Sequence, residues 1–488
     1  MEFEAVLNAN MEEIVREILL DLDENEDAIG KNEPKEFPPM LGLGDGNVVY
    51  VTRKTVELAN RLRRAVYSIE TDPKQFFTHK DFKNVVEHAV ANTLLEVRTG
   101  GNTEENCQSF LKHFENYVGD SIDKIKDQGG REYCFGCSLV SEPNVSPFDI
   151  GSVRFEPRAV WLERKSTEKR TSKIGARSRV IEITQGELPS QISSSTKRRI
   201  LRHWNGETLR PRRPSKDSCT EGSILNAVGE FPYVSTVTMP GLGSDLSYTR
   251  APKAVQTALT GISLMWTQPS SALQGLSFSY RAEQRDSPIL FFTKSGLALG
   301  GVHQYVRPYA SYIDETPFEK MLTRFDPVLK SVGDVIEWNL SPKGQYSNPA
   351  VRGVLSQALY WFRNACIAEM DLVAITGFAT CLDILSLGQY ETQRLALISK
   401  MCEADPDSEF LNDGTTIKEF LKRVFDGRRR MLHGPFSGSG TQKWDDQFTQ
   451  DWIEVRSQVE YLARSCLVGC LDWAFRNPSQ DTPNSFVK

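Results

Sequence analysis

Residues 371–385 read Asp371-Leu-Val-Ala-Ile-Thr-Gly-Phe-Ala-Thr-Cys-Leu-Asp383-Ile-Leu385, a segment that is apolar on nearly every side of a helix. A helix of this kind is normally surrounded by other elements, so we expect residues 371–386 to form the centre of a helical bundle. The run from Leu372 to Leu385 is interrupted by Asp383 and is shorter than the roughly 18 apolar residues that a membrane span needs.

Helical patterns continue on both sides of this segment. Apolar residues at three- and four-residue spacing predict helices over about 350–369, 390–402 and 451–475. Thr416-Ile-Lys-Glu419 is a capping-box pattern, in which two side chains satisfy each other's free backbone amides. It predicts the start of a helix that ends near His433. Short links between these helices indicate a bundle over residues 341–488.

The preceding residues carry mixed patterns. An amphipathic helix within residues 1–20, an acidic linker at 21–27, and helices near 55–67 and 80–95 indicate a mostly helical region over residues 1–130. Short alternating runs between Pro, Gly and Ser predict a β-rich middle domain over residues 131–340, with strands near 152–162, 179–184, 233–239, 276–280 and 289–292. The fold class that we expect is α+β, ending in an all-α bundle.

The overall composition is that of a globular protein. Of the 488 residues, 39% are hydrophobic and 25% are charged. The 9 cysteines are an odd number, and several lie in apolar helical patterns, which favours buried thiols in a reducing cytosol over a disulfide framework. The acidic N-terminus lacks a signal segment. We expect a cytoplasmic protein without a membrane segment.

The helix that opens at Thr416 ends in Phe425-Asp-Gly-Arg428-Arg-Arg-Met-Leu-His433-Gly434-Pro435, an Arg-x4-His pattern. Such a short motif arises easily by chance, and Arg198-Arg-Ile-Leu-Arg-His203 has the same spacing. Only the second occurrence comes with an amphipathic helix, an aromatic residue and a preceding apolar helix that holds a carboxylate.

In this context the chain resembles the HEPN superfamily, in particular its ApeA-like branch from prokaryotic defence and toxin proteins. The resemblance covers residues 348–475 and depends on Leu421–Gly434 with the apolar helix around Asp383. It implies a helical bundle that cuts RNA without a metal, as a homodimer whose two motifs share a cleft. By this resemblance Arg428 and His433 are the catalytic residues. Arg429 occupies the position at which the family usually has Asn, Asp, Ser or His. Asp383 occupies a position at which the family often has Glu.

The residue types suit RNA cleavage. RNA supplies its own nucleophile, the 2′-hydroxyl, so a histidine that moves protons near neutral pH and a guanidinium that holds the phosphate are sufficient, and we expect no cofactor and no metal. On a helix Arg429 shares the face of His433, whereas Arg428 is offset by roughly 140°. Both arginines therefore remain candidates. Asp383 either orients His433 or caps a helix.

A basic segment in the middle region is a candidate nucleic-acid contact. Residues 153–216 hold 17 Lys and Arg against 6 Asp and Glu. We expect residues 164–179 and 193–216 to be long loops, whose positive charge and single indole suit phosphates and bases. The candidate contact residues are Lys197, Arg198, Arg199, Arg202, Trp204, Arg212 and Arg213.

The sequence thus predicts an RNA endonuclease whose residues 1–340 respond to a trigger molecule or a regulatory protein. The alternative is a non-catalytic nucleic-acid-binding or dimerisation module. A third interpretation uses Asp149, Glu163 and Lys165, which follow the D…ExK order of metal-dependent nucleases and would need adjacent strands. Cys134-Phe-Gly-Cys137 is a single cysteine pair without further zinc ligands nearby and is interpreted as structural.

Overall fold

A computed structural model of the chain describes residues 2–29, 39–43, 48–69, 71–97, 103–127, 131–140, 145–167, 171–173, 181–184, 192–279, 286–292, 298–304, 317–342, 348–388, 390–433 and 452–487. The chain divides into two compact units. Unit 1 comprises residues 1–131 and 239–250, and unit 2 comprises residues 132–238 and 251–488. The regions 131–340 and 341–488, predicted as separate domains, thus lie almost entirely within one unit.

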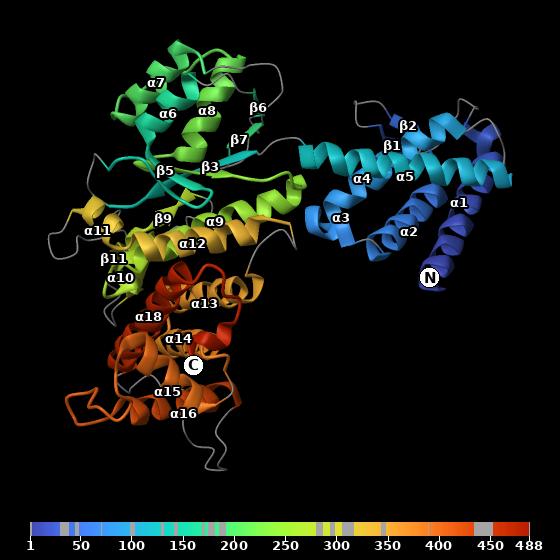
Figure 1. The fold of residues 1–488 in the computed structure, drawn as a ribbon. Helices are drawn as coiled ribbons and strands as arrows, with labels where there is room; N and C mark the ends of the chain where they lie inside the picture. Colours follow the sequence, from blue (N-terminus) through green and yellow to red (C-terminus); the bar gives the residue numbers. More distant parts are fainter. Residues whose placement is uncertain are drawn as a thin grey trace. The chain divides into compact units, whose positions relative to one another are not determined.

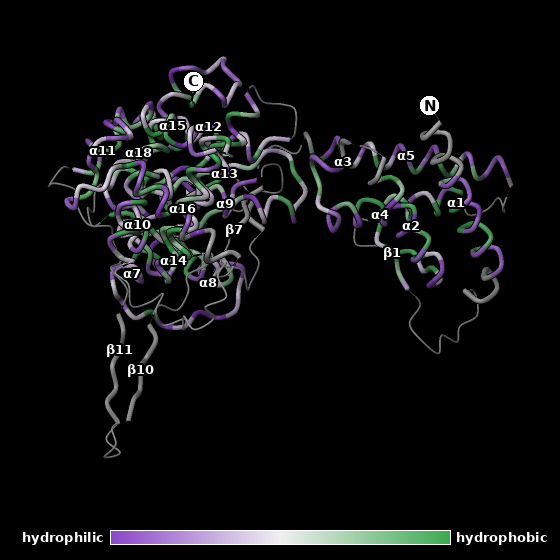
Figure 2. The backbone as a smooth tube through the Cα atoms, turned by 90° about the horizontal axis from the view of Figure 1, so that it is seen from below, coloured by the Kyte–Doolittle hydropathy of each residue, from purple (hydrophilic) through white to green (hydrophobic). Residues whose placement is uncertain are grey.

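Unit 1 is mainly helical and includes a short hairpin (Figure 1). Its elements are α1 (Glu2–Ile29), β1 (Met40–Gly42), β2 (Val48–Tyr50), α2 (Arg53–Ile69), α3 (Thr71–Phe76), α4 (His79–Val97), α5 (Glu104–Asp127) and the start of α9 (Ser244–Ser263). Hydrophobic and hydrophilic colours alternate along α1, α2 and α5 in Figure 2, as expected for amphipathic helices. The helices predicted near 55–67 and 80–95 are confirmed, whereas α5 had no sequence prediction.

The acidic stretch 21–27 is part of α1, so the prediction of a linker there is wrong. Asp21 is buried and accepts hydrogen bonds from the hydroxyls of Thr52 and Thr55, the second at 2.8 Å. Thr52 in turn accepts the Thr55 N–H at 3.0 Å, at the start of α2. A buried carboxylate is tolerated where its oxygens are hydrogen-bonded, and here this bonding lets the helix continue through acidic residues.

Unit 2 contains an antiparallel sheet with strand order β4-β5-β8-β3-β7-β6, to which β9 adds by pairing with β3. The strands are β3 (Glu132–Ser138), β4 (Phe148–Ile150), β5 (Val153–Pro157), β6 (Thr171–Lys173), β7 (Ile181–Thr184), β8 (Tyr233–Thr238) and β9 (Ser277–Phe278); β10 (Asp286–Phe292) and β11 (Ala298–Gln304) form a separate antiparallel pair. Most predicted strands are confirmed. The strand predicted over 152–162 is confirmed only as far as Pro157, and a helix begins at Arg158. Pro157 has no N–H to continue the strand pairing, and proline is favoured at the start of a helix.

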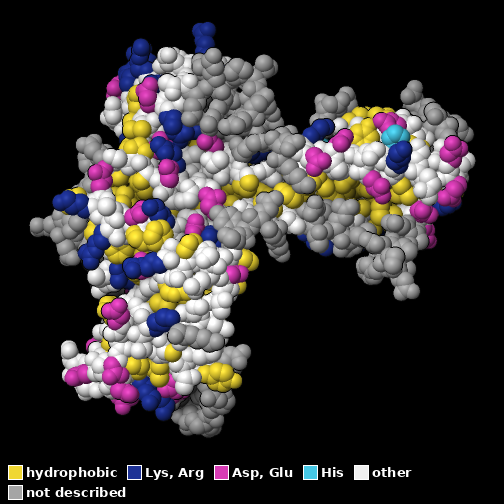
Figure 3. Space-filling view, in the orientation of Figure 1, with side chains coloured by type: hydrophobic (Ala, Val, Ile, Leu, Met, Phe, Trp, Pro, Cys, Tyr) yellow, Lys and Arg dark blue, Asp and Glu magenta, His cyan; other side chains and the backbone are white. Residues whose placement is uncertain are grey.

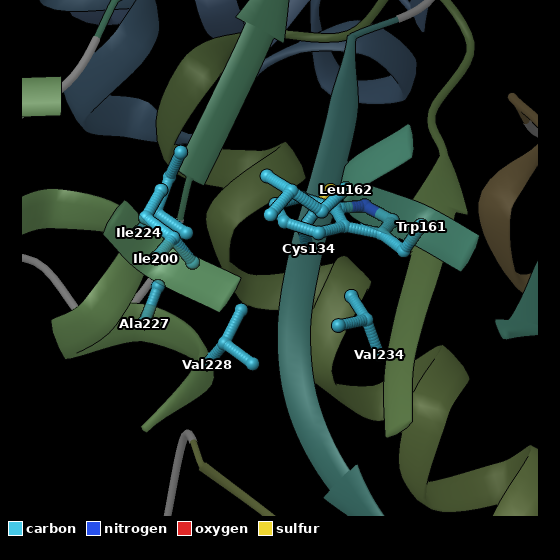
Figure 4. Packing of buried hydrophobic residues seen from close by; sticks show 8 residues of the cluster. All are labelled: Cys134, Trp161, Leu162, Ile200, Ile224, Ala227, Val228 and Val234. Carbon is cyan, nitrogen blue, oxygen red and sulfur yellow. The ribbon is translucent and has the colours of Figure 1, made fainter. Parts of the chain in front are cut away.

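Helices α6 (Arg158–Thr167), α7 (Ser194–Trp204) and α8 (Lys216–Val228) pack together with the sheet. Figure 4 shows Ile200 of α7 beside Ile224 of α8, and Trp161 near Cys134 of β3. The Ser193 side chain accepts the backbone N–H of Thr196 and caps α7. The prediction of a long loop over 193–216 is therefore wrong for its first half, because burial of Ile200 stabilises a helix in spite of the dense positive charge.

Helix α12 (Asp326–Leu340) packs against both the sheet and the C-terminal helices. Gly333 on α12 meets the β4–β5 turn so closely that a Cβ atom added there would lie 2.6 Å from the backbone nitrogen of Gly151. On its other side Ser331 donates to the carbonyl of Leu471 at 2.6 Å. Two further short helices, α10 (Pro269–Gly275) and α11 (Phe318–Arg324), lie in the same part of the chain.

The C-terminal helices form the predicted bundle. They are α13 (Pro349–Ile367), α14 (Asp371–Leu385), α15 (Glu391–Cys402), α16 (Ile417–His433) and α18 (Trp452–Arg476), followed by the 3₁₀ turn η2 (Pro483–Phe486). Each begins and ends within a few residues of its predicted bounds. The capping box is confirmed: Glu419 accepts the Thr416 N–H at 3.0 Å, and Thr416 accepts the Glu419 N–H at 3.3 Å.

Helix α14 is the central member of the bundle and packs against α13, α15, α16 and α18. Gly377 permits its closest approach to α13, because a Cβ atom there would lie 2.8 Å from the Cβ of Ala365. The chain is thus of the α+β class with a helical C-terminal region. Within the described ranges, every helix is too short or too polar to cross a lipid bilayer.

Candidate functional site

Asp383 lies near the end of the apolar helix α14, and its carboxylate joins two other helices. Oδ1 accepts a hydrogen bond from Nη1 of Arg394 on α15 at 2.7 Å. Oδ2 accepts one from Nη1 of Arg428 on α16. A carboxylate on a helix with so much buried surface requires charged partners, and here two guanidinium groups share it. The three residues define the arginine–aspartate cluster.

Phe425 completes the cluster on the α16 side. The guanidinium carbon of Arg394 lies 3.8 Å from the centroid of the Phe425 ring, and that of Arg428 lies 5.9 Å from it. Phe425 and Arg428 are three residues apart, so they share one side of the helix. Contact with an aromatic face adds attraction for a cation and restricts the arginine rotamers. The ring therefore helps to hold both guanidinium groups in place.

The cluster is accessible to solvent and keeps unused hydrogen-bond donors. The side chains of Asp383, Arg394 and Arg428 are 18%, 16% and 23% exposed. A guanidinium has five N–H donors, and the bond from Arg428 to Asp383 uses Nη1. Nε of Arg428 is buried without a hydrogen-bond partner in the described part of the chain. Since two cations share one anion, the cluster retains one positive charge, which suits a phosphate.

The structure brings together two of the four predicted catalytic residues. Arg428 and Asp383 are in direct contact, so the carboxylate engages arginines. The backbone of α16 extends through Arg429 to His433. The side chains of Arg429 and His433 lie outside the described part of the structure.

Arg394 is the functional candidate that sequence reasoning missed. It lies 11 residues after Asp383 in the chain, on the next helix. A signal was present, because a charged residue within an otherwise apolar helix predicts an oppositely charged partner on a neighbouring one. Helical periodicity does not tell which of the neighbouring cations faces it.

The predicted nucleic-acid residues on and after α7 are largely engaged by carboxylates of the same unit. Arg199 donates to both oxygens of Glu221 at 2.8 and 2.9 Å, and its hydrogen bonding is the main cause of the lowered pKa of Glu221. Arg212 reaches the same carboxylate at 3.2 Å. Arg202 pairs with Glu207 at 2.6 Å, and Lys197 pairs with Glu163. These four cations therefore stabilise the fold locally.

The remaining three members of the predicted set differ in exposure. Trp204 is half-buried against the α6–α8 core, with Arg158 stacked 5.1 Å from its ring centroid. Arg198 and Arg213 are exposed and have no ion-pair partner among the described residues. Figure 3 shows basic side chains over the position that α7 has in Figure 1, next to acidic ones. The basic surface is consequently smaller than the composition suggests.

The arrangement needed for a D…ExK metal site is absent from the described residues. Glu163 and Lys165 lie on helix α6 instead of a strand adjacent to Asp149. Asp149 and Lys165 also have other partners. Asp149 pairs with Arg154 at 3.1 Å, and Lys165 forms a buried ion pair with Glu132. No group of three potential metal ligands occurs among the described side chains. The metal-dependent interpretation therefore lacks its structural basis.

Cys134 and Cys137 lie on β3 and are both buried. Burial raises the pKa of both thiols. Thiols held in the neutral form are poor nucleophiles and poor metal ligands, which agrees with a structural role.

The described geometry thus offers a partly exposed cationic cluster that includes Arg428 of the Arg-x4-His motif. Its charge and its donors are suited to a phosphate group. Comparisons of the chain with family models, with curated proteins and with solved structures found no match.

Proposed function

We propose that the chain is a metal-independent endoribonuclease of a prokaryotic defence or toxin type, with Arg428 and His433 at its active site. His433 would exchange protons with the 2′-hydroxyl and the leaving oxygen, while a guanidinium stabilises the charge that builds up on the phosphate. The attack of the 2′-hydroxyl breaks the P–O5′ bond and leaves a 2′,3′-cyclic phosphate. The proposal needs no metal.

The observation that carries the proposal is the arginine–aspartate cluster. An isolated motif arginine at the end of an exposed helix would be a mobile cation. Arg428 is instead held by Asp383 and by the Phe425 ring, while Arg394 supplies a second guanidinium beside it. Groups that are fixed before the substrate binds stabilise a transition state better than mobile ones. The cluster therefore supports phosphate binding next to the motif.

Two further parts of the proposal concern assembly and control. The histidine and the arginine of one motif are a small acid–base set, so we propose a homodimer in which two motifs act on one RNA. An RNase that is always active would harm its host, so we propose that residues 1–340 restrain it until a trigger molecule or a regulatory protein binds. The exposed Arg198 and Arg213 are candidates for additional RNA contacts.

The test is cleavage of a labelled RNA by purified protein in EDTA, together with growth of cells that express it. His433→Ala and Arg428→Ala should abolish both cleavage and growth inhibition. Arg423→Ala is the matched control, since Arg423 is exposed on the same helix and makes no contact with the cluster within the described part of the chain. Cleavage by His433→Ala at the wild-type rate in EDTA would exclude the assignment.

The same series separates the two candidate arginines. If Arg428 holds the phosphate, Arg428→Lys should lose most activity, because lysine cannot keep both the contact with Asp383 and a paired contact with phosphate. If Arg429 holds the phosphate, Arg429→Ala should be the more damaging change, and Arg428→Lys should be partly active.

A non-catalytic binding or dimerisation module is the second candidate. It is favoured by the exposed apolar side chains on α13 and α14, among them Tyr360, Trp361 and Val373, which are 63%, 39% and 48% exposed. Exposed aromatic side chains such as Tyr360 and Trp361 are enriched at contact surfaces. RNA binding that persists in His433→Ala, without cleavage by the wild-type protein under any condition, would support this function over the first.

A further inference from the structure

Two thiols from different helices of the bundle are in contact. Sγ of Cys402, the last residue of α15, lies 3.6 Å from Sγ of Cys466, which lies in the middle of α18. The two residues are 64 positions apart in the chain. Cys466 is fully buried, whereas Cys402 is half-buried.

A glycine brings the two helices close enough for this contact. A Cβ atom added to Gly469 of α18 would lie 2.9 Å from both the Cβ and the carbonyl oxygen of Met401. The end of α15 therefore rests directly on the backbone of α18, one residue before Cys402. Any larger side chain at position 469 would separate the helices and the two thiols.

The two thiols differ in mobility and in chemistry. Cys402 is followed by Glu403 in the left-handed region, at φ 53°, so its helix ends there. Cys466 is fixed in a continuous helix. The contact between the two thiols lowers the pKa of Cys402, and the same contact together with burial raises the pKa of Cys466. Cys402 is also the more exposed of the two thiols, so it is the nucleophile of the pair.

We propose that Cys402 and Cys466 are a modification site at which a hydroperoxide forms a reversible disulfide. The Cys402 thiolate attacks one peroxide oxygen; the O–O bond breaks, giving a sulfenic acid and hydroxide, or an alcohol from an organic peroxide. The Cys466 thiol then attacks the sulfenic sulfur and releases water. In total two thiols are oxidised and one peroxide is reduced. A disulfide needs a sulfur separation of about 2.0 Å, so the sulfur atoms approach by roughly 1.5 Å.

The disulfide would stabilise the bundle. It closes a loop that contains α16, and α15 also carries Arg394 of the arginine–aspartate cluster. For a loop of this length, the loss of unfolded-state entropy lowers the unfolding equilibrium constant by roughly 10²- to 10³-fold. The proposal does not depend on ribonuclease activity.

The experiment treats the reduced full-length protein with hydrogen peroxide and maps its disulfides by mass spectrometry of a non-reducing digest. The expected result is a Cys402–Cys466 cross-link that dithiothreitol removes, together with a higher melting temperature. Cys402→Ser and Cys466→Ala should each lack the cross-link and the shift. Cys219→Ser is the matched control, because Cys219 is exposed on α8, and it should behave as wild type.

A third variant tests the geometry without removing a thiol. Gly469→Ala should slow the cross-link by about tenfold or more, because the added methyl group separates the ends of the two helices. The proposal is overturned if peroxide modifies Cys219 while Cys402 and Cys466 remain reduced. It is equally overturned if the cross-link forms only in urea, since the native contact would then not direct the reaction.

Discussion

Replacing Asp383 by asparagine is the most informative perturbation of the bundle. The carboxylate accepts one charge-assisted hydrogen bond from Arg394 and one from Arg428. Asparagine preserves the shape of the side chain but keeps one acceptor oxygen and no charge. Two partly buried guanidinium groups would then face each other without a shared anion.

The expected loss follows from the geometry. A hydrogen bond to a charged group contributes about 1.5–3 kcal/mol, and asparagine retains part of one such bond. The three side chains are 16–23% exposed, so solvent screens a fraction of the interaction. We expect the free energy of unfolding to fall by about 2–3 kcal/mol, at or just below the lower end of the range of about 3–5 kcal/mol for breaking a fully buried ion pair.

Tryptophan fluorescence during urea unfolding measures this change in unit 2 alone. All 8 tryptophans lie in the two segments that form unit 2. A loss of 2–3 kcal/mol corresponds to a decrease in the midpoint of about 1 M urea. The RNA cleavage rate should fall in the same variant, because Arg428 loses its anchor.

Asp371→Asn is the matched control on the same helix. Asp371 makes one ion pair, with Arg456 at 2.9 Å, and Arg456 also donates to the carbonyl of Cys366. We expect a loss of about 0.5–1 kcal/mol, typical of an ion pair near the surface. If Asp383→Asn is no more destabilising than this control, the carboxylate does not hold two arginines and the cluster is misassigned.

The remaining predictions concern packing and buried charge, and each is measured by the same unfolding assay. Gly136→Ala should destabilise the folded protein by about 3 kcal/mol or more, because its Cβ would lie 2.3 Å from the carbonyl oxygen of Val228. Gly222→Ala should stabilise it by about 0.5–1 kcal/mol, because Gly222 lies within α8 and has open space around it. The reverse order would contradict the packing of α8 on β3. Burial raises the pKa of Glu460, so the folded state favours the protonated form and wild-type stability should fall as pH rises from the ordinary value of 4.5 through the raised one. Glu460→Gln should remove this slope, and an unchanged slope would place the titration elsewhere. The pH dependence from Glu221 has the opposite sign, because its arginine partners lower its pKa. Its contribution to the free energy of unfolding is present above pH 4.5 and is lost as pH falls. Glu221→Gln should therefore lower the free energy of unfolding by about 2 kcal/mol at neutral pH and weaken its decrease at acidic pH. If the stability of Glu221→Gln decreases at acidic pH as steeply as that of the wild type, the ion pairs of Glu221 contribute little.

Features set by neighbouring residues were predictable from the sequence. The apolar pattern of residues 371–385 and the spacing in the flanking segments located each helix of the bundle that the structure describes, since burial of one stripe of a helix depends on periodicity alone. The Thr416–Glu419 box marked the start of α16 because both of its hydrogen bonds are local. The Arg-x4-His motif was visible for the same reason.

Features that depend on distant partners were not predictable. The stretch 193–216 reads as a solvated basic loop until Glu163 and Glu221, from other helices, neutralise its charges and the sheet buries Ile200. The sequence does not tell which cations meet Asp383; only the packing of α15 and α16 on α14 brings Arg394 and Arg428 to its carboxylate. Periodicity determines which face of a helix is buried, but only tertiary packing decides which charges meet, because an ion pair depends on a few ångströms between segments that the chain order leaves unrelated.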